Sequence, residues 1–115
     1  MKSRGIIYVV WGKYNKSLLK RSTDSAEKFG YDYTVKEIEP QYEGLINKIK
    51  MWDSPYDITL FLDADTEIKG NIDFGFEMAE KHGLACCIAP ASNLYQASFK
   101  SMKHLIHRDA IQYNT

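Results

Sequence analysis

The sequence predicts an α/β domain: a Rossmann-like, open and mostly parallel sheet with helices on both faces. Segments typical of strands and of helices alternate along the chain, and this alternation is characteristic of parallel βαβ units. The strand candidates are mostly apolar on both faces, as expected of strands in a sheet that helices cover on both sides. At 115 residues the chain has room for one core, so we expect residues 1–115 to form a single domain.

The first strand and helix are marked by their composition and by capping residues. Residues 6–11 are rich in β-branched and aromatic side chains, which predicts a buried strand that ends at Gly12. Asn15 is a candidate N-cap for a helix whose less polar positions recur near the helical period until Gly30 stops it. Residues 31–38 are then predicted to form a second strand.

A second helix and a third strand follow Pro40. Four residues are predicted to share the apolar face of this helix, which should end near Pro55 because the residue before a proline disfavours the helical conformation. These four are Leu45, Ile46, Ile49 and Trp52. Residues 58–62 are nearly all apolar, which predicts the third strand.

One more helix and strand complete the alternation. Asn71 or Asp73 is the expected cap of a helix that runs to His82 and ends at Gly83. Residues 84–89 are predicted to form a fourth strand, and the chain beyond Pro90 is predicted to be loop with at most one short helix.

Charge and hydropathy exclude several classes of partner. Fifteen Lys and Arg balance fifteen Asp and Glu, so we expect neither a nucleic acid nor an anionic membrane as partner. The apolar run 6–11 is far shorter than the roughly 18 to 20 residues of a membrane span or the roughly 7 to 15 of a signal-peptide core. We therefore expect no integral membrane segment and a cytoplasmic location. The adjacent Cys86 and Cys87 lie in an apolar stretch and are predicted to be buried thiols.

Two aspartates follow the third predicted strand, and ligands of open α/β sheets bind at the carboxyl ends of strands. In an extended strand Asp63 and Asp65 would project to the same side, with their Cα atoms roughly 6 to 7 Å apart. Carboxylates this close repel unless a cation compensates them, and Mg²⁺ or Mn²⁺ binds such oxygen ligands together with water and phosphate. The spacing therefore favours a metal site, although backbone donors in an acidic turn could satisfy the same residues.

A longer series of residues around these aspartates resembles a known family. The series comprises Asn47-Lys48-Ile49-Lys50-Met51-Trp52, Pro55-Tyr56-Asp57, Leu60-Phe61-Leu62-Asp63-Ala64-Asp65-Thr66 and Asn71-Ile72-Asp73. It resembles the nucleotide-sugar-binding core of GT-A glycosyltransferases, and it looks closest to the glycogenin-like enzymes of glycosyltransferase family eight.

The resemblance implies a function and a set of site residues. Asp63 and Asp65 would hold Mn²⁺ or Mg²⁺ against the diphosphate of a nucleotide-sugar donor, UDP-glucose or UDP-galactose. The sugar would be transferred with retention of its anomeric configuration to an acceptor that the sequence does not identify. The residues that would contact the donor are Tyr8, Val10, Tyr14, Lys48, Ala64 and Asn114, with Tyr14 stacking on the uracil ring.

The resemblance covers nearly all of this chain but only about the first half of a GT-A domain. The family completes its metal site with a downstream histidine, which has no recognisable counterpart in His82, His104 or His107. We therefore expect a truncated transferase, and we assign no catalytic residue. A truncated sheet would expose an unpaired strand edge, so a homodimer is also expected.

Two other functions stay open at this point. A catalytically inert nucleotide-binding module would keep the same fold without the reaction. A haloacid-dehalogenase-type phosphohydrolase also ends an apolar strand with Asp-x-Asp, but its pattern has Thr or Val where this chain has Glu67.

Overall fold

The computed structural model describes residues 2–88 and 113–114, which fall into two compact units, Met1–Gly83 and Leu84–Thr115. The first unit contains β1 (Arg4–Trp11), α1 (Lys16–Lys28), β2 (Tyr33–Ile38), the 3-10 helix η1 (Gly44–Asp53), β3 (Ile58–Phe61) and α2 (Asp73–His82). The second unit contains β4 (Cys87–Ile88) and β5 (Tyr113–Asn114). The prediction of one domain over the whole chain stays a prediction.

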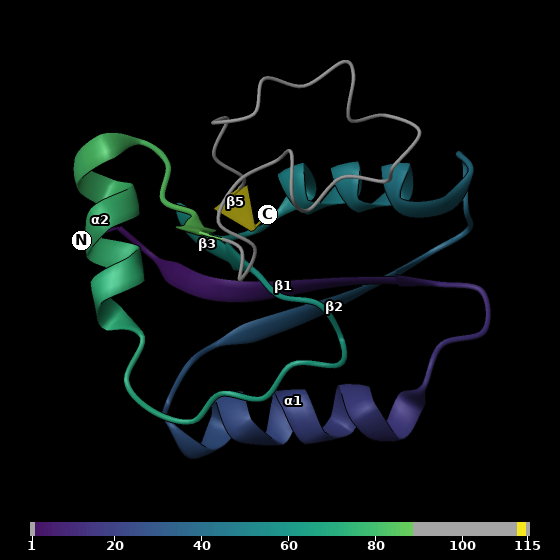
Figure 1. The fold of residues 1–115 in the computed structure, drawn as a ribbon, viewed down its shortest axis with the longest axis horizontal. Helices are drawn as coiled ribbons and strands as arrows, with labels where there is room; N and C mark the ends of the chain where they lie inside the picture. Colours follow the sequence, from purple (N-terminus) through teal and green to yellow (C-terminus); the bar gives the residue numbers. More distant parts are fainter. Residues whose placement is uncertain (1, 89–112, 115) are drawn as a thin grey trace. The chain divides into compact units, whose positions relative to one another are not determined.

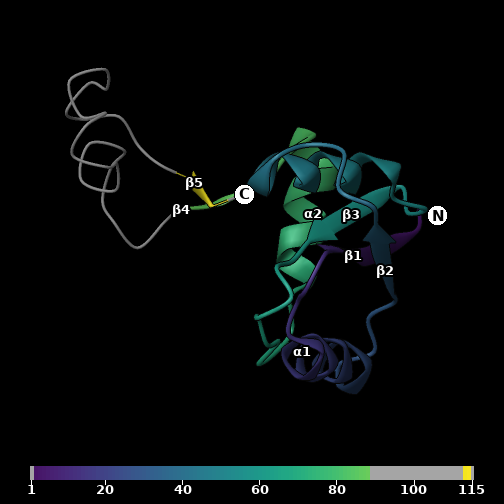
Figure 2. The ribbon, with the colours of Figure 1, turned by 90° about the vertical axis from the view of Figure 1, so that its right-hand side faces the viewer.

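The three strands of the first unit form a parallel sheet in the order β2-β1-β3. Residue Ile6 of β1 lies opposite Leu60 of β3, and Tyr8 lies opposite Val35 of β2. Helix α1 covers one face of this sheet and η1 covers the other (Figures 1 and 2). The prediction of a parallel α/β sheet with helices on both faces is confirmed for this unit.

The first helix begins and ends where its capping residues indicate. The side-chain oxygen of Asn15 accepts hydrogen bonds from the backbone N–H groups of Ser17 and Leu18, each at 3.1 Å. Gly30 follows the helix with a φ of 77°, in the left-handed region that glycine adopts without strain. Helix α2 ends in the same way at Gly83, which caps it with a φ of 84°.

The start of α2 differs in detail from the expected cap. The formal N-cap is Ile72, which makes no side-chain hydrogen bond. The side chain of Asn71 instead accepts a hydrogen bond of 2.8 Å from the backbone N–H of Asp73, the first residue of the helix.

One core cluster lies between the sheet, α1 and α2. Its members come from five segments of the first unit and are all buried: Ile6, Tyr8, Ala26, Ile58, Ile68 and Phe76. The ring of Phe76 also stacks on the ring of Tyr31, with centroids 6.0 Å apart. The segment that follows β3 therefore folds back onto the face of the sheet that α1 covers.

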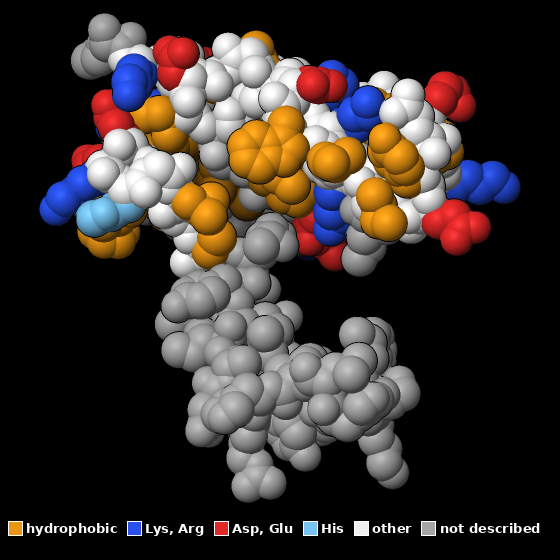
Figure 3. Space-filling view, turned by 90° about the horizontal axis from the view of Figure 1, so that it is seen from above, with side chains coloured by type: hydrophobic (Ala, Val, Ile, Leu, Met, Phe, Trp, Pro, Cys, Tyr) orange, Lys and Arg blue, Asp and Glu red, His pale blue; other side chains and the backbone are white. Residues whose placement is uncertain are grey.

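The segment after β2 departs from the prediction. It forms a 3-10 helix, and the side chains of Ile46, Ile49 and Trp52 are exposed by 62%, 51% and 81%. Hydrophobic side chains are visible on the surface that faces the viewer in Figure 3. A 3-10 helix has three residues per turn, so residues 46, 49 and 52 form one row. Three of the four residues of the predicted apolar face are therefore exposed, and the side chain of the fourth, Leu45, lies outside the described part of the structure.

The fourth predicted strand is also different. The strand β4 covers Cys87–Ile88, and its pairing with β5 is antiparallel, whereas a parallel strand was predicted. The predicted burial of Cys86 is wrong, because its side chain is exposed. Residues 89–112, including His104 and His107, lie outside the described residues.

Among the described residues β3 pairs with β1 alone. The homodimer expected from an open strand edge stays a prediction. No helix in this part of the chain combines the length and the apolar character that a membrane span needs.

Candidate functional site

The two predicted metal ligands lie in a turn directly after β3. The strand ends at Phe61, and the backbone N–H of Leu62 still donates to the carbonyl of Ile7 at 3.2 Å. The chain then turns, with the N–H of Thr66 donating to the carbonyl of Asp63 at 3.2 Å. Asp63 and Asp65 are exposed, and the alternation of an extended strand does not apply to them because the backbone is no longer extended.

The structure brings Lys48 to this turn. Its ammonium nitrogen lies 2.8 Å from Oδ1 of Asp63, although fifteen residues separate the two in sequence. The same ammonium lies 5.7 Å from the centroid of the Phe61 ring, at the end of β3, within the range of a cation–π contact. A quarter of the Lys48 side chain is exposed. Two of the residues that the family resemblance selects therefore meet at the carboxyl end of a parallel strand.

The residue before Lys48 explains why this lysine reaches the sheet. Asn47 is almost fully buried, and its side-chain oxygen accepts from the backbone N–H groups of Gln41 and Tyr42. Its side-chain nitrogen donates to the carbonyls of Tyr42 and Gly44 at 2.7 and 2.9 Å. This amide therefore fixes the chain that enters η1 to the first turn of that helix.

Asn47 has a structural role that sequence reasoning missed. Asparagine is disfavoured in the interior of a helix, since its side-chain amide competes with the helix for backbone hydrogen bonds. Burial of Asn47 is therefore not expected from the sequence. In the sequence Asn47 stands between the loop that contains Tyr42 and Gly44 and the residue Lys48. Hydrophobic periodicity does not detect a buried polar residue at such a position. Lys48 follows directly, so the buried amide limits where the ammonium group can lie.

The side chains of Tyr8 and Val10 belong to the core. Tyr8 has no exposed surface, and its hydroxyl lies 2.7 Å from the hydroxyl of Ser22. Burial raises the pKa of the Tyr8 hydroxyl above its ordinary value. Val10 is also buried. The structure does not bring these two side chains to the Lys48–Asp63 contact.

Tyr14 lies at a different hollow of the first unit. It is half-buried and lines a shallow depression of about 340 Å³ with residues of α1 and β2, among them Leu19 and Tyr33. The described lining of this depression includes neither Lys48 nor the two aspartates. The predicted stacking of Tyr14 on a base stays a prediction.

The remaining predicted residues are placed as follows. Ala64 is half-buried within the turn between the two aspartates. Asn114 lies in β5, opposite Cys87 in the register of the two-stranded sheet of the second unit. His82 is exposed in the last turn of α2.

The donor set at the turn fits a hard divalent cation. Among the described residues, no three His, Cys, Asp or Glu side chains cluster as a complete metal cage. Mg²⁺ does not need such a cage, because it commonly takes one or two carboxylates and fills its other positions with water and phosphate oxygens. The turn presents two exposed carboxylates, and the ammonium group of Lys48 lies beside the Asp63 carboxylate.

Comparisons of the chain with models of protein families, with curated proteins and with solved structures gave no match. The residues at the turn, their geometry and the resemblance carried by the sequence motifs are the features that point to a function.

Proposed function

We propose that this chain binds a nucleoside diphosphate sugar through a divalent cation, Mn²⁺ or Mg²⁺, at the turn that contains Asp63 and Asp65. The observation that carries the proposal is the 2.8 Å contact between Lys48 and Asp63 at the end of β3. Lys48 and Asp63 come from separate segments, and the resemblance to family-eight glycosyltransferases assigns both of them to the donor site.

The Lys48–Asp63 pair can change partners without leaving a charge uncompensated. In the structure the ammonium group of Lys48 compensates the Asp63 carboxylate. With a cation and a diphosphate bound, the Asp63 carboxylate would hold the cation and the Lys48 ammonium group would bind a phosphate oxygen. Charge-assisted contacts of this kind are stronger than neutral hydrogen bonds. The arrangement therefore favours joint binding of cation and diphosphate over binding of either one alone.

In the proposed reaction the bond between the sugar and the diphosphate breaks, and negative charge builds on the departing phosphate oxygens. A cation held by Asp63 and Asp65 would supply Lewis-acid stabilisation of these oxygens. Lys48 contributes most where the charge is fully developed, so its contact is stronger in the transition state than in the ground state. The resemblance implies transfer with retention from UDP-glucose or UDP-galactose, and no residue of this chain is assigned as nucleophile or base.

Calorimetric titration with UDP, with and without Mn²⁺, tests the binding proposal. We expect Asp65→Asn to weaken UDP binding in Mn²⁺ by at least about tenfold, since one charged ligand of the cation is lost. Lys48→Met should weaken it by a similar factor. Lys36→Met is the matched control, because Lys36 makes a 3.0 Å ion pair with Asp53 and is about as exposed as Lys48. The control should stay within about twofold of wild type.

Equal UDP affinity in wild type and Asp65→Asn would contradict the proposal. Release of free sugar from UDP-glucose or UDP-galactose without an acceptor separates a transferase from an inert module of the same fold. Mn²⁺-dependent UDP binding without sugar release would indicate the inert module.

A further inference from the structure

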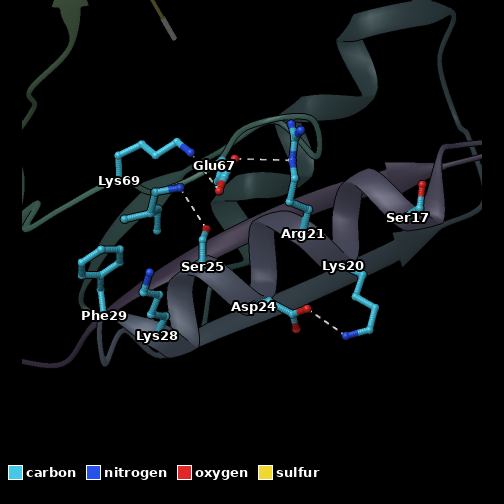
Figure 4. Close-up of a pocket in the computed structure, with 10 residues that line it drawn as sticks. Ser17, Lys20, Arg21, Asp24, Ser25, Lys28, Phe29, Glu67 and Lys69 are labelled. Atoms are coloured by element: carbon cyan, nitrogen blue, oxygen red, sulfur yellow. Dashed lines mark hydrogen bonds and ion pairs between the residues drawn. The ribbon is translucent and has the colours of Figure 1, made fainter.

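The segment that contains the two aspartates is attached to helix α1 at several points. The Nη2 group of Arg21 donates to the carbonyl of Asp65 at 3.2 Å. The backbone N–H of Ile68 donates to the hydroxyl of Ser25 at 2.9 Å. Figure 4 shows this Ser25 contact and the Arg21–Glu67 ion pair along one side of α1. The polar side chains of α1 therefore hold the chain that follows β3.

A row of hydroxyl groups, buried at its inner end, reaches the turn itself. The hydroxyl of Ser22, which has no exposed surface, lies 2.7 Å from the Tyr8 hydroxyl and 3.2 Å from the Thr66 hydroxyl. The Thr66 hydroxyl in turn donates to the carbonyl of Asp63 at 2.8 Å. The row thus links the core of the sheet to the backbone of a predicted cation ligand.

The direction of each hydrogen bond in this row follows from proton counting. A carbonyl oxygen only accepts, and each hydroxyl has one proton to donate. Because Thr66 gives its proton to Asp63, it must accept from Ser22. Because Ser22 gives its proton to Thr66, it must accept from Tyr8. The three hydroxyls therefore all point their donors toward the turn, and removing Ser22 or Thr66 breaks the row.

We propose that Ser22, Thr66 and Arg21 are positioning residues for the cation-binding turn. This inference rests on the proposed function, and it adds that the turn is ordered before the ligand arrives. Hydrogen bonds to the carbonyls of Asp63 and Asp65 fix the backbone from which both carboxylates project. A turn already held in place loses less conformational entropy on binding, so the affinity for cation and diphosphate is higher.

A second pair of hydroxyl groups supplies a matched control. Thr34 and Tyr56 form a part-buried hydroxyl–hydroxyl hydrogen bond of 2.9 Å that does not involve the turn. Thr66→Val and Thr34→Val are the same chemical change, and each removes one hydroxyl from such a bond. A merely structural role of Thr66 predicts the same effect on UDP affinity for both variants.

The experiment measures UDP affinity in Mn²⁺ together with the thermal midpoint of each variant. We expect Thr66→Val and Ser22→Ala to weaken UDP binding about five- to tenfold. Thr66→Ser keeps the hydroxyl and should stay within about twofold of wild type. Thr34→Val should lower the thermal midpoint but leave UDP affinity within about twofold.

Two variants at exposed positions keep the inference testable if Thr66→Val and Ser22→Ala fail to fold. Arg21 is half exposed, so Arg21→Met should fold, and it should weaken Mn²⁺-dependent UDP binding by a few-fold. Lys20→Met, at the neighbouring position, removes only the exposed ion pair with Asp24 and should have no effect on binding.

The outcomes separate this inference from the proposed function. Mn²⁺-dependent UDP binding by wild type, with unchanged affinity in the folded Thr66, Ser22 and Arg21 variants, would overturn the positioning role alone. Equal losses in Thr66→Val and Thr34→Val would do the same. Absence of UDP binding by the wild-type protein would overturn the proposed function, and the positioning role with it.

Discussion

The two faces of the parallel sheet are covered in different ways. On the α1 face, residues such as Ile6, Ala26 and Phe76 meet in one buried cluster. On the η1 face, Ile7 and Val9 of β1 are also buried, but the covering helix exposes Ile46, Ile49 and Trp52. These three hydrophobic residues of η1 are thus exposed although the helix covers the sheet.

The difference shows that a row of apolar side chains on a helix is buried only where another segment of the chain packs over it. On the α1 face, Ile68 and Phe76 come from the chain that follows β3 and complete the cluster. The structure describes no such layer over the row 46, 49 and 52, which is exposed. On that face the inward positions include the buried amide of Asn47 and the ammonium group of Lys48.

The largest expected effect is at the closed core. Phe76→Ala removes a ring that is 97% buried, and we expect the free energy of unfolding to fall by about 3 to 5 kcal/mol. Phe74→Ala, two residues earlier in α2, is the matched control because that ring is 70% exposed, and it should change stability by no more than about 0.5 kcal/mol. Urea denaturation followed by circular dichroism measures both. Similar losses in the two variants would mean that α2 does not pack as described.

A smaller effect is expected where Tyr56 lies against β1. A Cβ atom at Gly5 would overlap the Tyr56 ring, whose hydroxyl bonds Thr34, so Gly5→Ala must displace the ring. We expect a loss of about 1 to 3 kcal/mol in the free energy of unfolding. The control is Gly75→Ala in α2, where a Cβ meets no atom, and which should raise stability by up to about 1 kcal/mol. Thermal unfolding distinguishes the opposite signs, and a neutral Gly5→Ala would contradict this packing.

The smallest effect is expected on the exposed row. Trp52→Ser should change the free energy of unfolding by no more than about 0.5 kcal/mol, because the indole ring is 81% exposed and loses few contacts. The emission maximum of Trp52, measured in a Trp11→Phe background, should lie near that of a solvated indole. A blue-shifted emission with a stability loss above about 1 kcal/mol would show that another layer covers this row.

Local signals in the sequence predicted most elements of the first unit. Asn15 caps α1, and Gly30 and Gly83 follow α1 and α2 in the left-handed conformation, as expected. The three strands of the sheet lie within two residues of their predicted bounds. Such signals are reliable because a cap or a stop depends on one or two neighbouring residues.

Predictions that depended on distant segments were less successful. The apolar period of η1 indicated a buried face, but the 3-10 geometry turns residues 46, 49 and 52 outward. Cys86 was expected to be buried and is exposed. In both cases a local pattern states which residues are apolar, but not which other segment approaches them.

The amino-acid order alone therefore determined the parallel α/β arrangement of the first unit, the ends of its α-helices and the acidic pair after β3. Only the folded chain placed Lys48 against Asp63 and aligned Ser22 and Thr66 behind the same turn. The physical reason is the separation along the chain of the residues that interact. Capping and strand propensity act between neighbours along the chain, whereas these contacts join residues fifteen and forty-four positions apart. They exist only once β1, α1, η1 and β3 have packed together.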